Sequence, residues 1–84
     1  MSKYYPLQEY LMKIPEEVFE IKLSLDFIQN NLQIKLPDSA NKKKFWANDR
    51  TNSRMQAVAW LSAGWIVNKY SSENSIVFFQ REIY

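Results

Sequence analysis

Residues 65–81 have the sequence WIVNKYSSENSIVFFQR, which gives the clearest indication of the fold. Two apolar runs, residues 65–70 and 75–81, flank the polar residues 71–74, a pattern typical of two strands joined by a hairpin loop. Gly64 lies directly before the first run, where glycine commonly ends a helix because it adopts the left-handed backbone conformation without strain. The C-terminal third is therefore predicted to be the end of a helix followed by a β-hairpin.

The residues near the N-terminus show two helical patterns and one strand pattern. Pro6 suits the first turn of a helix, and the apolar residues after it follow the spacing of one helical face: Leu7, Tyr10, Leu11 and Ile14. Pro15 ends this helix, and a half-buried strand follows in which three apolar residues alternate with polar ones: Phe19, Ile21 and Leu23. Ser24 is a candidate N-cap for a second helix, whose inner stripe comprises Leu25, Ile28 and Leu32.

The middle of the chain, residues 33–52, has no regular pattern. Asp38 or Ser39 is expected to cap a short helical turn that contains the three consecutive lysines Lys42, Lys43 and Lys44. A further helix is predicted to begin near Thr51 or Asn52 and to end near Ala63. The predicted order is helix, strand, helix, helix, strand, strand. We therefore expect one α+β domain over residues 1–84, winged-helix-like, with a C-terminal β-hairpin.

Composition limits the chemistry that this chain can perform. The 84 residues include neither cysteine nor histidine, which excludes zinc fingers of the usual kind and the Ser-His and Cys-His nucleophile pairs of hydrolases. We expect a non-enzymatic protein without cofactor or metal. The sequence shows neither the pattern of a signal peptide nor an apolar run of membrane-spanning length. We therefore expect a cytoplasmic domain with no membrane partner.

Positive charge is concentrated in one segment. Residues 35–54 contain six basic and two acidic residues, a local excess of four positive charges in a chain whose total is +2. A basic patch on a nearly neutral protein is typical of a surface that contacts phosphate. The alternative is that these lysines only keep a surface loop in solution.

The helix after this segment has one face whose residue types suit contact with DNA bases, here called the reading strip. At about 100° per residue, the strip formed by Asn52, Gln56, Ala59 and Ala63 combines two amides with two small side chains. Asn and Gln are the usual bidentate partners of adenine in the major groove. The alternative is that Ala59 and Ala63 face the sheet while Gln56 and Asn52 lie in solvent, with Asn52 only capping the helix.

Four blocks of the sequence resemble a family of small bacterial and phage domains: Lys3-Tyr4-Tyr5-Pro6-Leu7 with Tyr10-Leu11, Leu36-Pro37-Asp38-Ser39-Ala40, Phe45-Trp46-Ala47-Asn48-Asp49, and Ala59-Trp60-Leu61-Ser62-Ala63-Gly64-Trp65. The resemblance spans nearly the whole chain. It implies a self-contained domain and no particular activity, because the family is one of unknown function. This chain departs from the family pattern at Phe45, where tryptophan is usual, and at Asn41, where arginine is expected.

The sequence favours binding of nucleic acid, in particular double-stranded DNA. The candidate phosphate contacts are Lys42, Lys43, Lys44, Arg50 and Arg54, the candidate base contacts are Asn52 and Gln56, and Trp46 is the tryptophan most expected to expose an edge for stacking. The alternative is a protein-interaction module, such as a small phage-type inhibitor or an accessory subunit. Self-association through an edge strand of the hairpin is a third possibility.

Overall fold

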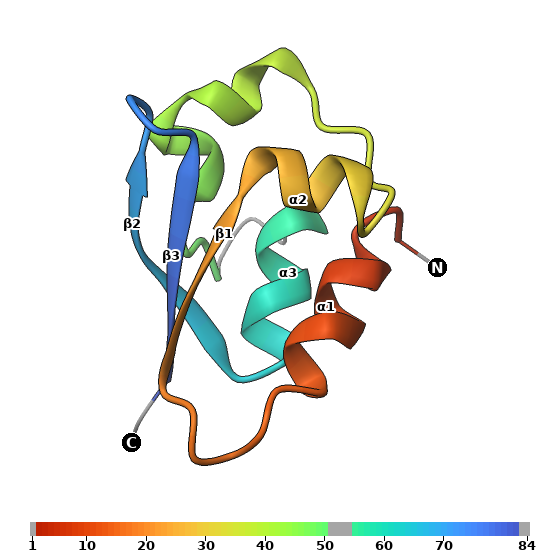
Figure 1. Ribbon diagram of the computed structural model, residues 1–84, viewed down its shortest axis with the longest axis vertical. Helices are drawn as coiled ribbons and strands as arrows, with labels where there is room; N and C mark the ends of the chain where they lie inside the picture. The colour runs from red at the N-terminus through yellow and green to blue at the C-terminus, as the bar shows by residue number, and fades with distance from the viewer. Residues whose placement is uncertain (1, 51–54, 83–84) are drawn as a thin grey trace.

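The computed structural model describes residues 2–50 and 55–82 (Figure 1). Within these ranges the helices are α1 (Tyr5–Met12), α2 (Leu25–Asn30) and α3 (Met55–Ser62), and the strands are β1 (Glu20–Ser24), β2 (Trp65–Ser71) and β3 (Ile76–Arg81). Two short 3-10 helices, η1 (Asp38–Asn41) and η2 (Lys43–Trp46), lie between α2 and α3. This confirms a small α+β domain with a C-terminal hairpin.

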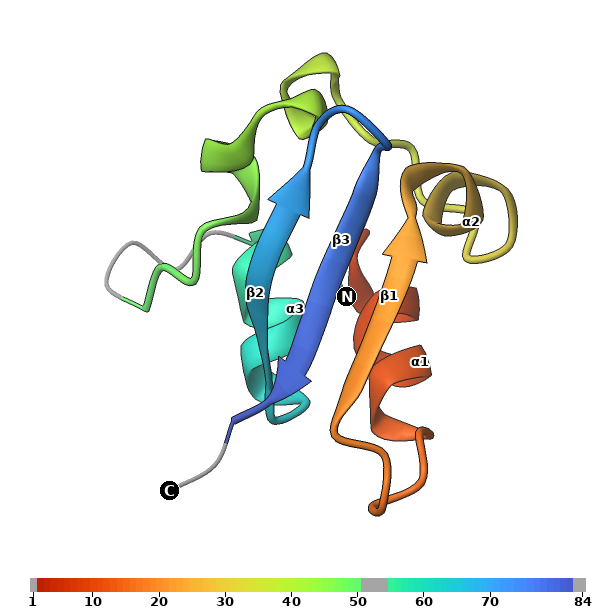
Figure 2. The same ribbon diagram turned by 60° about the vertical axis from the view of Figure 1, so that its left-hand side comes forward.

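The sheet is antiparallel, with the strand order β1-β3-β2, so that the last strand lies in the centre. Helices α1 and α3 cover one face of the sheet, and none of the described helices covers the opposite face, here called the open face, as Figures 1 and 2 show. The side chains of β3 alternate accordingly: Val77 and Phe79 are buried under the helices, whereas Phe78 points to the open face and is half-buried.

Local signals explain where three of these elements begin or end. The hydroxyl of Ser24 accepts a hydrogen bond of 3.0 Å from the backbone N–H of Phe27, which confirms Ser24 as the N-cap of α2. Pro6 lies in the first turn of α1, as expected. Gly64 follows α3 with a φ of +84°, the left-handed conformation expected of the residue that ends a helix.

The lysine-containing segment differs from the single capped turn predicted for it. Lys42 has an extended backbone, with φ −108° and ψ 140°, and it separates η1 from η2. Neither Asp38 nor Ser39 caps a turn: Pro37 is the N-cap of η1, and proline has no side-chain group that could accept a hydrogen bond.

Phe19 and α3 also depart from the prediction. Phe19 precedes β1 and is 56% exposed, so it does not join Ile21 and Leu23 on the inner face of the strand. In α3 the buried residues are Ala57, Ala59 and Trp60. The small alanines allow α3 to pack closely against α1 and the sheet. No helix in the described part of the chain is long and apolar enough to cross a bilayer.

Candidate nucleic-acid interface

Trp46 lies in the aromatic core and does not expose an edge. The residue is 3% exposed, and its Nε1 donates a hydrogen bond of 2.9 Å to the carbonyl of Ala40. Its ring is stacked between those of Trp60 and Tyr70, with centroid distances of 5.5 and 6.0 Å. The expectation that Trp46 exposes an edge is therefore wrong: its short segment turns the ring inward, where three large aromatic residues bury one another.

Asn48 fastens the segment after η2 to the edge of the sheet. Its Oδ1 accepts hydrogen bonds from the backbone N–H of Val67, at 2.8 Å, and from Nε1 of Trp60, at 2.9 Å. Its Nδ2 donates to the carbonyl of Val67, also at 2.8 Å. The amide thus replaces a neighbouring strand at this point of β2, and it holds η2 at a fixed position beside the sheet.

Lysines from two elements converge on a groove between η2 and β2. This lysine groove has a volume of about 520 Å³ and is lined by Lys43, Lys44, Trp46, Ala47, Asn48, Val67, Asn68, Lys69 and Tyr70. All three of its lysines are exposed. Of the described residues that line it, none is acidic. The positive charge of the groove is therefore not offset by its own walls.

The predicted run of three lysines is only partly brought together. Lys42 lines a different hollow, of about 440 Å³, together with Lys44 and Gln56. The backbone explains this divergence: Lys42 is extended and precedes η2, whereas Lys43 and Lys44 lie within η2, where at about three residues per turn consecutive side chains point in directions about 120° apart. Lys44 borders both hollows, whereas Lys43 borders the lysine groove and is not among the described residues that line the hollow beside Lys42.

Of the two predicted arginines the structure describes Arg50, which is not among the residues that line this groove. Arg50 forms an ion pair with Glu82, so that its charge is balanced locally. Arg54 and Asn52 lie outside the described residues.

In the described part of the predicted reading strip on α3, both alanines lie against the core. Ala59 is 3% exposed and Ala63 packs against the core. Nε2 of Gln56 donates a hydrogen bond of 3.4 Å to the carbonyl of Phe45, which ties this amide to η2. The two alanines therefore face the interior, as the alternative interpretation expected, whereas Gln56 is half-buried and lines the hollow that Lys42 also borders.

Lys69 is the residue that sequence reasoning missed. Strict alternation from the buried residues Trp65 and Val67 would turn Lys69 inward. The pairing with β3 shifts between Val67 and Lys69, and this irregularity adds Asn68 to the strand. Lys69 is consequently exposed and Tyr70 is buried. Only the position of Tyr70, an aromatic residue out of phase with Val67, hints at such a bulge in the sequence.

Acidic residues do not gather into a cation site in the described ranges: no group of three or more carboxylate side chains there could hold a metal ion.

The chain is thus a small α+β domain whose antiparallel sheet carries a lysine groove at one edge. It belongs to the family described as a domain of unknown function (DUF7662), whose model matches residues 4–82. This confirms the expectation of a family of unknown function that spans nearly the whole chain. Comparison with the curated proteins and with the solved structures gave no match.

Proposed function

We propose that this chain is a non-catalytic nucleic-acid-binding domain that contacts phosphate through the lysine groove. The observation that carries the proposal is the convergence of Lys43 and Lys44 from η2 with Lys69 from β2 on one exposed surface. Lys69 lies 25 or more positions after the other two lysines and is brought beside them only by the fold.

The electrostatic argument depends on the local charge of the groove. The net charge of +2 for the whole chain is too small to attract a polyanion over long distances. Three ammonium groups on one surface, in contrast, can each neutralise a phosphate and release the counterion condensed on it. Each such contact contributes a slope of about −0.7 to −0.9 to the dependence of log K on log salt concentration.

The element order supports a winged-helix-like architecture for this proposal. Three helices and three strands occur in the order α1-β1-α2-α3-β2-β3, and β1 completes the sheet by pairing with β3 of the C-terminal hairpin. The contact surface that we propose differs from that of a recognition helix, because Ala59 of α3 is buried. Phosphate contact through the groove requires no particular base sequence.

A binding titration at several salt concentrations tests the proposal. The probes are a fluorescent 20-base-pair DNA duplex and its single strands as DNA and as RNA. Replacement of Lys43, Lys44 and Lys69 by glutamine should weaken binding of whichever probe binds and reduce the salt slope by about 2 to 3. The matched control replaces three other exposed lysines by glutamine, removing the same charge: Lys3, Lys13 and Lys35. Absence of binding to all probes at low salt, or equal losses in both triple variants, would contradict the proposal.

A protein partner is the second candidate, and the outward side of α3 favours it. Met55 and Val58 are 52% and 42% exposed and lie three residues apart, so they share one face of the helix. Exposed apolar side chains of this kind, methionine above all, are common at protein-binding surfaces. The test is whether a stoichiometric protein partner stays bound after nuclease treatment. Loss of that partner in a Met55→Glu, Val58→Glu double variant, together with its retention by the triple lysine variant of the groove, would favour this function over the first.

A further inference from the structure

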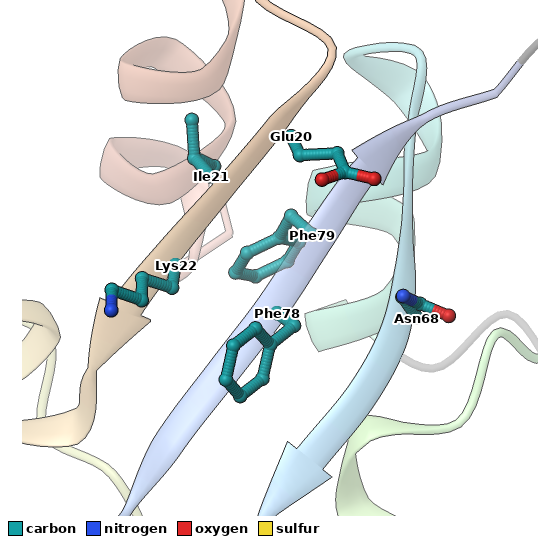
Figure 3. A pocket seen from close by; sticks show the side chains of 6 residues that line it. All are labelled: Glu20, Ile21, Lys22, Asn68, Phe78 and Phe79. Carbon is teal, nitrogen blue, oxygen red and sulfur yellow. The ribbon is translucent and has the colours of Figure 1, made fainter.

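The open face of the sheet carries an aromatic ring between two cations. In the strand register Lys22 of β1 lies opposite Phe78 of β3, and Lys69 of β2 lies opposite Phe78 on its other side. Figure 3 shows Phe78 projecting from the central strand, with Lys22 to one side and Asn68 to the other. The row Lys22-Phe78-Lys69 therefore crosses all three strands on the face that no helix covers (Figure 2).

Phe78 borders a shallow hollow on this face. The hollow has a volume of about 300 Å³ and is lined by Glu20, Ile21, Lys22, Asn68, Phe78 and Phe79. The ammonium group of Lys69 lies 5.2 Å from the centroid of the Phe78 ring, within the range of a cation–π contact. This lysine has a flexible stem and is exposed, so it can leave the ring face at little cost when another flat group covers the ring.

The row is continuous with the lysine groove. Asn68 lines both the hollow beside Phe78 and the groove, and Lys69 lines the groove while contacting the Phe78 ring. A chain of positive charge thus runs from Lys43 and Lys44 on η2, over the edge strand β2, to Phe78 and Lys22. An elongated polyanion fits this path better than a compact ligand does.

We propose that this open face binds single-stranded nucleic acid, with a base stacked on Phe78 and the adjoining phosphates held by Lys22 and Lys69. The inference rests on the nucleic-acid-binding function proposed above and names the form of nucleic acid that is bound. Lys22 and Lys69 stand two strand spacings apart, about 10 Å, so a base can cover the ring between them while both ammonium groups reach the same backbone.

Unpaired bases are the part of a nucleic acid that this surface can recognise. In a duplex the faces of the bases are covered by their neighbours, whereas a single strand can present them to an aromatic side chain on a sheet. Glu20, at the end of the hollow, repels phosphate and limits the path to the row Lys22-Phe78-Lys69. The flanking lysines also favour a polyanion over an apolar protein surface as the occupant.

The test compares Phe78→Ala with the wild type on the single-stranded and duplex probes. We expect the single strands to bind more tightly than the duplex. Loss of one base stack should weaken single-strand binding by about 5- to 150-fold and leave duplex binding unchanged. Phe78→Tyr retains an aromatic face and should bind nearly as well as the wild type. Ile76→Ala, on the same strand and face, is the matched control and should bind normally.

Circular dichroism and thermal unfolding show whether each variant folds. If Phe78→Ala does not fold, Phe78→Leu takes its place, since leucine retains apolar bulk without an aromatic face; it should show the same selective loss. Equal affinity of the wild type for duplex and single strand, or normal single-strand binding by the variant, overturns this inference and leaves the proposed function intact. No binding to any probe overturns both, and capture of a protein partner that depends on Phe78 overturns this inference alone.

Discussion

Asn48→Ala tests how the lysine groove is held together. The Asn48 side chain makes three hydrogen bonds, two with the backbone of Val67 and one with Nε1 of Trp60. In the variant the indole N–H of Trp60 loses its acceptor. Because Trp60 has no exposed surface, water cannot replace that acceptor, and the unsatisfied N–H costs about 1–3 kcal/mol. The two Val67 groups lie at the edge of the sheet, where water can replace the amide, and each contributes about 0.5–1.5 kcal/mol.

The free energy of unfolding should therefore fall by about 2–6 kcal/mol. This is a large share of the roughly 4–13 kcal/mol typical of a domain of this length. Urea denaturation followed by tryptophan fluorescence measures the difference. The matched control is Asn68→Ala, which removes an exposed amide from β2 at the position after Val67. This substitution should change stability by less than about 0.5 kcal/mol. Equal effects of the two substitutions would refute the structural role of Asn48.

Three other substitutions should change stability in directions that urea denaturation can measure. Among the described residues the hydroxyl of Tyr70 is buried without a hydrogen-bond partner, so Tyr70→Phe should raise the free energy of unfolding by about 1 kcal/mol; a loss of that size would show that the hydroxyl is satisfied. Gly64 has positive φ and open space around its Cα, so Gly64→Ala should cost about 1 kcal/mol through backbone strain alone. Gly64→Asn should cost less, since asparagine tolerates this conformation, and the reverse order would exclude the explanation. Loss of the Ser24 cap in Ser24→Ala should cost about 1 kcal/mol, whereas Ser24→Asp should retain most of the stability; equal losses in both would argue against the cap.

The elements that the sequence predicted correctly depend on short-range signals. Ser24 caps α2 and Gly64 ends α3 because each acts on the backbone within three or four residues of itself. The hairpin followed from two apolar runs around a polar loop, which is also a local pattern. Such features need no knowledge of the rest of the fold.

The features that sequence reasoning missed depend on contacts between distant residues. Trp46 is buried because Trp60 and Tyr70 stack on it, and nothing in the run of lysines before it indicates this. Lys69 turns outward because the strand is irregular after Val67. Arg50 looked available for phosphate, but its partner, Glu82, lies 32 positions later. The sequence therefore showed where the charged residues lie along the chain. It did not show which way their side chains point or which residues they pair with.

The interface is tested most directly by NMR, with amide shifts recorded while a single-stranded oligonucleotide is added to the intact chain. We predict that the shifts concentrate at Lys22 and at residues 43–46, 66–69 and 76–80, which belong to β1, η2, β2 and β3. Shifts confined to residues 55–62 of α3, or no shifts at low salt, would contradict the account.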